Sequence, residues 1–428
     1  MSYTQLGLES MFTKFTLIVS GHVVWNIQKI PWNWYLYQEK QLGFMVNLLD
    51  YWLCTFWVLC SRINNRWLIR DKRIAMMLNT TRFKYLFKRL VQGPTRLSDC
   101  ASKSWTINPS EEACSRPAIY LEGELNNIIE VEEHTNFEAE HTRVKGGVTT
   151  HAATRAFEFR NIMLNDGYLY KNNLKTPLIT KNEKLFDFSH SATINKASLA
   201  CSWCGNKYFG HWLTDDLPLA IAVGVFAEPV RTEQTFTEHQ KEYANIFDIH
   251  PLHLNKAYFN SLYILEDFSQ NSYKRERYEQ LRSKLAKAIV TPTENKHVMV
   301  LRGKSGISRI LENELKVADI LKTLGFTIVE PEKLSAIDLS KSLFEAEIVV
   351  GVEGSHLVHS IFSMKTGGTI LAIQPPFRFS AVIKDYTDCL DLNYSFIVGE
   401  ETTTGFSVNL DRLKKLLDKI IVKHDPVF

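Results

Sequence analysis

Apolar and polar residues alternate in blocks along residues 296–424, and the blocks predict strands that alternate with helices. Short apolar runs predict strands within 296–303, 326–331, 348–354 and 369–376. Amphipathic segments between and after them predict helices at 308–325, 335–347, 355–364 and 410–424. This alternation implies βαβ units around a parallel sheet, so the C-terminal part of the chain is predicted to be an α/β domain.

Residues 117–290 also mix strand and helix patterns. A strand is predicted to begin this region at 117–131, and two aromatic-rich runs around Asn165-Asp166-Gly167 predict a hairpin. A turn followed by an apolar helix is predicted at 207–226, and a charged amphipathic helix at 272–290. Two α/β regions in succession suggest two Rossmann-like domains that face each other across a cleft.

Residues 1–95 are rich in aromatic and basic residues and are predicted to form an extra helical region. The stretch 42–60 is apolar apart from Asn47 and Asp50. A bilayer span needs about 20 apolar residues, and Asp50 would be costly near its centre. A span, a membrane-surface helix and a buried core helix all stay open. The basic and aromatic stretch 62–96 suits either an anionic lipid surface or a solvated helix face.

The length of 428 residues indicates several domains, for which we predict the bounds 1–95, 96–290 and 291–428. The net charge of +3 is small for this length and gives no indication of a nucleic-acid partner. The seven cysteines are odd in number and follow no disulfide framework, which predicts reduced thiols. Together with the lack of a recognisable secretory signal, they predict a cytoplasmic location.

Cys201-Ser-Trp-Cys204 is a CxxC pair, which supplies half of a structural zinc site. The sequence shows no second pair, although His190 and His211 are close enough to be considered as ligands. Two small apolar residues in a packed segment are therefore the favoured interpretation, and no metal site is predicted.

Polar residues gather where the predicted C-terminal strands end. Arg302 leaves the first strand and opens the loop Gly303-Lys304-Ser305-Gly306, after which Ser308 is placed to cap a helix with Arg309 in its first turn. Glycine-rich loops present backbone N–H groups to anions and arginines bind phosphate oxygens, so this loop suits a diphosphate. It is neither a Walker A loop nor GxGxxG, which argues against an ATPase or a standard dehydrogenase. A plain basic turn is the alternative.

A second strand end reads Gly351-Val-Glu353-Gly354-Ser355-His356. Its two glycines permit close approach to the backbone, and Ser355 is placed to cap the following short helix. Glu353 or His356 could then bond a ribose or sugar hydroxyl. A tight turn that needs glycine for its geometry alone is the alternative.

A third candidate is the pair His211 and Asp215, one helical turn apart on the same face. A carboxylate that orients an imidazole and stabilises its charge makes a general base. The alternative is an acidic first turn of a helix, a role that suits Asp216 best.

These segments, taken in order, resemble glycosyltransferase family 61. The pieces are His211-Trp-Leu-Thr-Asp215-Asp-Leu-Pro218, then Arg302 with Arg309-Ile-Leu-Glu-Asn313-Glu314, then the turn 351–356 with its helix to Phe362. The resemblance covers roughly residues 180–400. It departs from the family at Glu353, where many members carry a histidine, and at Ser355 and His356, where small residues are common.

The resemblance implies a GT-B architecture and an inverting, metal-independent enzyme without a cofactor. Such an enzyme moves a sugar from a nucleotide-diphosphate donor to a hydroxyl of a glycan or glycolipid, here in surface polysaccharide synthesis. Residues 96–290 would bind the acceptor and 291–428 the donor. Peripheral membrane contact through 1–95 is an expectation from the basic and aromatic composition of that region, which lies outside the resemblance. His211 and Asp215 would be catalytic, and the donor would be bound by Arg302, Lys304, Arg309, Asn313, Glu353, Gly354, Ser355 and His356. A non-catalytic nucleotide-sugar or carbohydrate-binding protein and a membrane-associated assembly protein are the alternatives.

Overall fold

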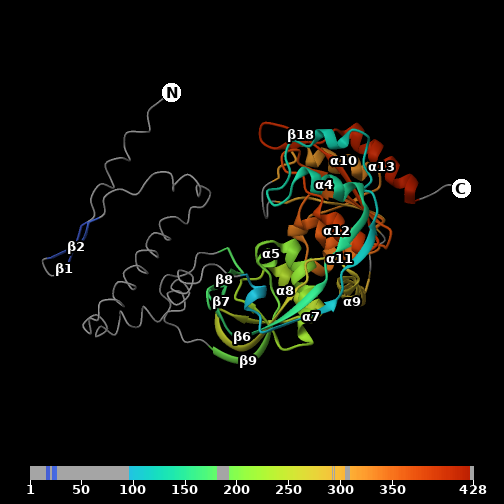
Figure 1. The fold of residues 1–428 in the computed structure, drawn as a ribbon. Helices are drawn as coiled ribbons and strands as arrows, with labels where there is room; N and C mark the ends of the chain where they lie inside the picture. The colour runs from blue at the N-terminus through green and yellow to red at the C-terminus, as the bar shows by residue number, and fades with distance from the viewer. Residues whose placement is uncertain are drawn as a thin grey trace. The chain divides into compact units, whose positions relative to one another are not determined.

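The computed structural model describes residues 16–19, 22–26, 96–180, 192–291, 293, 295–303 and 309–424. The chain divides into two units, Met1–Ala75 and Met76–Phe428. Figure 1 draws the described residues as a ribbon. In the first unit the described residues form the antiparallel strands β1 (Thr16–Val19) and β2 (His22–Asn26), within the region predicted to be helical. The predicted apolar segment 42–60 and basic segment up to residue 95 lie outside the described residues. None of the helices that the structure describes is long and apolar enough to cross a bilayer.

A five-stranded parallel sheet forms the C-terminal part of the second unit, which confirms the predicted strand–helix alternation. Its strands are β14 (Thr327–Val329), β13 (His297–Val300), β15 (Ile348–Val352), β16 (Thr369–Gln374) and β17 (Asn393–Val398). Its helices include α10 (Glu314–Thr323), α11 (Ala336–Leu343), the 3-10 helix η7 (Ser355–Ser360), α12 (Val382–Cys389) and α13 (Leu410–His424). The pattern analysis did not include β17 and α12.

The strand order of this sheet fixes where a ligand would bind. The chain enters at β13, places β14 on one side and β15 on the other, and then adds β16 and β17 beyond β15. The connections that leave β13 and β15 therefore run to opposite sides, which opens a crevice beyond the carboxyl ends of these two strands. The crevice lies where Arg302, just beyond β13, meets the turn 351–356 that follows β15.

A second sheet is mixed. Its order is β11 (Leu252–Leu254), β10 (Pro229–Thr232), β9 (Ala192–Leu199), β12 (Lys256–Glu266), β6 (Thr154–Asn165), β7 (Tyr168–Lys171) and β8 (Leu174–Pro177), with β3 (Lys103–Asn108) also paired to β6. The hairpin predicted around Asn165 is confirmed: Asp166 and Gly167 join β6 to β7 with φ of 46° and 79°, the left-handed backbone of a type I′ turn.

The helices around this second sheet carry the third candidate motif. They are α5 (Trp203–Lys207), α6 (Phe209–His211), the π-helical turn η5 (Trp212–Asp216), α7 (Leu217–Gly224), α8 (Glu238–Phe247) and α9 (Ser272–Ala288). The apolar helix after residue 207 and the charged helix at 272–290 are thereby confirmed. Large buried side chains from both halves, including Trp212, Tyr243, Tyr278, Leu357 and Phe362, share one core cluster.

Residues 117–145 lie against the parallel sheet although they fall between β3 and β6 of the mixed sheet in sequence. Ile119 makes a single bridge to Ser395 of β17, where the pattern predicted a strand. Arg143 of α4 (Phe137–Lys145) pairs with Asp385 of α12 at 3.0 Å. The antiparallel strands β4 (Glu111–Ser115) and β5 (Gly147–His151) pair with each other at the two ends of this segment. The structure is therefore α/β, as predicted, while the domain bounds and the GT-B arrangement stay predictions.

Candidate functional site

The His211–Asp215 motif lies on a helical segment that is interrupted by a π turn. Pro218 has no N–H with which to bond the carbonyl of Thr214, four residues before it. The Tyr278 hydroxyl donates to that carbonyl instead, at 2.9 Å. Gly210 lets the segment approach η7, because a Cβ at position 210 would lie 3.2 Å from Ser355 Oγ. A π turn is a common feature of functional sites, and here proline in the sequence accounts for it.

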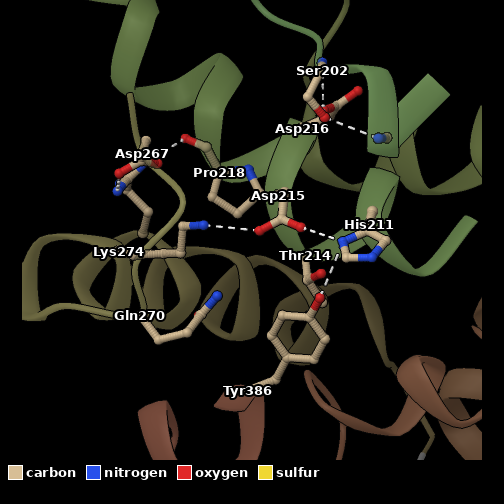
Figure 2. Close-up of polar contacts among 12 residues, drawn as sticks. Ser202, His211, Thr214, Asp215, Asp216, Pro218, Asp267, Gln270, Lys274 and Tyr386 are labelled. Atoms are coloured by element: carbon tan, nitrogen blue, oxygen red, sulfur yellow. Dashed lines mark hydrogen bonds and ion pairs between the residues drawn. The ribbon is translucent and has the colours of Figure 1, made fainter. Parts of the chain in front are cut away.

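Three side chains form a chain of polar contacts in this segment, drawn in Figure 2. His211 Nδ1 lies 2.7 Å from Asp215 Oδ2, and Lys274 Nζ of α9 lies 2.9 Å from Asp215 Oδ1. Lys274 is fully buried. Burial by itself would raise the pKa of Asp215, but the Lys274 ammonium and the His211 hydrogen bond outweigh burial and lower it to about 2. Asp215 is therefore a carboxylate at any pH near neutrality.

The ionised carboxylate determines which nitrogen of His211 is free. A carboxylate only accepts hydrogen bonds, so Nδ1 carries the ring proton and donates a hydrogen bond to Asp215. The Tyr386 hydroxyl oxygen of α12 lies 3.3 Å from the same Nδ1 (Figure 2). The neutral imidazole then presents the Nε2 lone pair, and His211 is part-exposed, so Nε2 is the atom that can accept a proton.

Lys274 is held in place by the start of α9. Asn271 caps this helix by accepting from Lys274 N–H at 3.0 Å. Arg277, one turn later, donates to both oxygens of Asp267 at 2.6 and 2.9 Å and to the Pro218 carbonyl at 3.1 Å. Both partners of this ion pair are buried. These contacts of Arg277 fix α9 against the end of β12 and against α7, and so set the position of the Lys274 ammonium.

Asp216, next to Asp215, points to a different set of partners. Ser202 donates to Asp216 Oδ1 from its backbone at 2.9 Å and its hydroxyl at 2.8 Å. Burial raises the pKa of Asp216 to about 7. Cys201 and Cys204 are free thiols, and burial raises the pKa of Cys201 to about 11. The CxxC segment thus serves to place Ser202 against Asp216, while His190 lies outside the described residues.

Two arginine side chains lie against the turn at 351–356. Arg302 Nη1 lies 2.8 Å from His356 Nδ1, and Arg309 Nη1 donates to the Glu353 carbonyl at 2.9 Å. Gly354 has a φ of 148°, and a Cβ there would lie 2.1 Å from Arg302 Nη1 and 2.7 Å from Arg309 Nη1. Glycine is therefore required for the guanidinium groups to lie this close.

A third arginine, which the sequence did not single out, joins this cluster. Arg378, beyond the end of β16, lies 3.4 Å from Glu353 Oε2, and Arg309 Nε lies 3.1 Å from the same oxygen. Burial lowers the pKa of Arg309 to about 10 and also lowers that of Arg302, yet both stay charged near neutrality. The carboxyl ends of β13, β15 and β16 thus hold three cations around one buried carboxylate.

Two local predictions in this region are wrong. The helix predicted from residue 308 begins at Glu314, because Leu311 bridges to Phe406 and Glu312 N–H donates to the Phe406 carbonyl. Arg309 therefore precedes the helix. The 3-10 helix η7 has Gly354 at its N-cap without a side-chain cap, so Ser355 is its first residue and not its cap.

Two further donor candidates are not brought to the turn by described contacts. The Asn313 side chain exchanges both of its amide hydrogen bonds with the Val408 backbone, at 2.8 and 3.1 Å, which favours a structural role. Lys304 lies outside the described residues.

A cavity of about 980 Å³ opens beside His211 and Asp215. Its walls come from β4, β5, α4, α5, the loop between β12 and α9, and α12. Its volume lies at the upper end of the range for ligand sites. Arg302, Arg309, Glu353 and His356 are not among the residues that line it.

A family model described as Glycosyltransferase 61 matches residues 209–371. The match runs from the α6 motif through the arginine cluster to β16, so it contains both groups of candidate site residues. Comparison with curated proteins finds no match. The resemblance noted in the sequence is confirmed: residues 209–371 match the model of glycosyltransferase family 61.

Proposed function

We propose that this glycosyltransferase is an inverting enzyme that uses a nucleotide-diphosphate sugar and transfers the sugar to a glycan hydroxyl. One observation carries the proposal: the His211–Asp215 pair and the arginine–glycine turn lie on segments in direct contact, α6 and η7. A base and a group of cations for a leaving diphosphate are thereby held next to each other.

The arginine cluster supports the donor half of the proposal. Arg302 and Arg309 lie at the crevice between β13 and β15, the position where doubly wound sheets bind nucleotides. Guanidinium groups recognise phosphate oxygens in bidentate geometry. They would supply the positive charge that offsets the departing diphosphate, and this supports transfer that does not depend on a metal.

The chain of contacts from His211 through Asp215 to Lys274 supports the acceptor half of the proposal. His211 Nε2 would take the proton of the acceptor hydroxyl as its oxygen attacks the anomeric carbon. The bond from that carbon to the diphosphate oxygen breaks, and the nucleoside diphosphate leaves with the electron pair. Attack from the face opposite the leaving group inverts the anomeric configuration. Asp215 stabilises the imidazolium that forms.

The proposal extends in three ways, the first two from the family resemblance and the third from the composition of the chain. The two sheets would form the two halves of a GT-B enzyme, with the donor on the parallel sheet. The glycan product would belong to a surface polysaccharide. The enzyme would work in the cytoplasm, with residues 1–95 as its contact to the membrane.

A thermal-shift panel of nucleoside diphosphates and nucleotide-sugars, without added metal, tests the donor site. A ligand that binds the folded state raises the melting temperature by mass action. We expect one nucleotide to raise it in wild type and in the control Arg160→Ala, where the arginine side chain is 61% exposed, but not in Arg302→Ala. Absence of any shift in well-folded wild type would refute the donor site. NMR of the product anomer then tests inversion.

A further inference from the structure

Among the described residues, seven acidic side chains line the cavity beside His211, and most of them are paired within the protein. Six of these acidic side chains have partners within the protein: Asp215 with Lys274, Asp216 with Ser202, Asp267 with Arg277, Asp385 with Arg143, Asp388 with Lys384, and Glu111 with Ser272. The two lining arginines are likewise paired, Arg143 with Asp385 and Arg275 with Asp391. An anionic ligand that binds Arg143 or Arg275 would have to compete with Asp385 or Asp391 for the guanidinium group.

Paired charges suit an uncharged polyol. A carboxylate in an ion pair retains lone pairs that accept from hydroxyl groups, and a paired guanidinium retains N–H groups that donate to them. Four residues line the cavity and take part in such ion pairs: Asp385 and Asp388 of α12, Arg143 of α4 and Arg275 of α9. Hydroxyls of a sugar could bond them without a change in the net charge of the site.

Aromatic side chains add apolar faces to the same wall. Phe268, in the loop between Asp267 and α9, lines the cavity and is 74% exposed. Trp203 at the start of α5 also lines it. Phe268 and Trp203 therefore present apolar ring faces within the wall of the cavity. The apolar C–H faces of a sugar ring pack against such rings, while its hydroxyls reach the paired charges.

We propose that this cavity is the acceptor site and that it takes an uncharged glycan. The proposal rests on the proposed function, because it assigns His211 Nε2 as the atom that meets the acceptor hydroxyl. Arg302, Arg309 and Glu353 do not line the cavity, so the donor and the acceptor would approach His211 from different sides.

Substitution of Ala139 by tryptophan tests the assignment. Ala139 is an exposed residue of α4 that lines the cavity, so the larger side chain can fill it without disturbing the core. Glu138→Trp is the matched control, since Glu138 is exposed on the same helix and does not line the cavity. Binding is read by saturation-transfer NMR with neutral methyl hexosides and methyl disaccharides, and with methyl glucuronoside as the anionic probe.

We expect neutral glycosides to bind wild type and Glu138→Trp, and their signal to fall at least fivefold in Ala139→Trp. The nucleotide-induced thermal shift should be the same in all three proteins. Preference for the glucuronoside, equal binding by Ala139→Trp, or no neutral glycoside bound while the nucleotide shift persists would each overturn the acceptor assignment. Absence of the nucleotide shift from wild type would instead refute the proposed function.

Discussion

Replacement of Lys274 by methionine tests the ion pair that holds the Asp215 carboxylate. Methionine keeps the apolar stem but removes the ammonium, which lies buried at 2.9 Å from Asp215 Oδ1. Burial raises the pKa of Asp215, Lys274 is the strongest opposing influence, and the pKa ends at about 2 instead of 3.8. This difference corresponds to about 2 kcal/mol of folding stability. Because the ammonium also offsets the cost of burying the carboxylate, we expect Lys274→Met to lower the free energy of unfolding at neutral pH by at least about that amount.

The pH dependence gives a sharper criterion. A carboxyl group whose pKa is lowered on folding adds stability above its unfolded pKa and loses it as pH falls through its folded pKa. For Asp215 this window runs from about pH 4 down to about pH 2. In Lys274→Met, burial without the ammonium should raise the folded pKa of Asp215. The difference in free energy of unfolding between wild type and Lys274→Met should therefore be largest at neutral pH, and narrow as pH falls from that raised pKa down to about 2.

Urea unfolding followed by tryptophan fluorescence at a series of pH values measures this difference. Lys287→Met is the control, because Lys287 is exposed on the same helix and its replacement should change stability by less than about 0.5 kcal/mol. A loss that stays constant from neutral pH down to pH 3 would refute the ion-pair reasoning. So would a loss no larger than that of the control.

Four further outcomes follow from the site. His211→Ala should lower the transfer rate by about 10² to 10⁴ and leave the nucleotide thermal shift intact, as measured in parallel assays. Arg309→Lys loses the donor to the Glu353 carbonyl and should lower kcat by at least about tenfold, whereas an unchanged kcat would exclude a role in leaving-group stabilisation. Gly354→Ala places a Cβ 2.1 Å from Arg302 Nη1 and should abolish the nucleotide thermal shift. Because burial raises the pKa of Asp216 to about 7, wild type should lose stability as pH rises from 4 to 7, and Asp216→Asn should flatten that slope in urea unfolding.

Local patterns were enough to predict much of the fold. The 410–424 helix has the bounds that its amphipathic period predicts, and Asp166-Gly167 forms the hairpin turn that this dipeptide favours. The His211–Asp215 pair was also readable, because its contact depends on one turn of helix. These features are determined by residues close in sequence.

The remaining site depends on contacts between distant segments. Lys274 lies 59 residues from Asp215, and Tyr386 lies 175 residues from His211. The start of α10 was mispredicted for the same reason, since Leu311 is drawn into a bridge with Phe406. One signal was available: Lys274 occupies the same helical stripe as the buried Tyr278, Leu281 and Leu285 of α9. A lysine on an apolar stripe indicates a buried partner.

The position of His211, the proposed base, depends on contacts from both the mixed-sheet and the parallel-sheet parts of the second unit. Asp215 and Lys274 hold His211 Nδ1 from the helices of the mixed sheet, whereas Tyr386 approaches it from α12 of the parallel sheet. The α6–η7 contact at Gly210 fixes the same two halves beside the arginine turn. A displacement of one half would therefore disturb the imidazole and its distance to the cations together. The close packing of these segments aligns the proposed base and leaving-group sites as one unit.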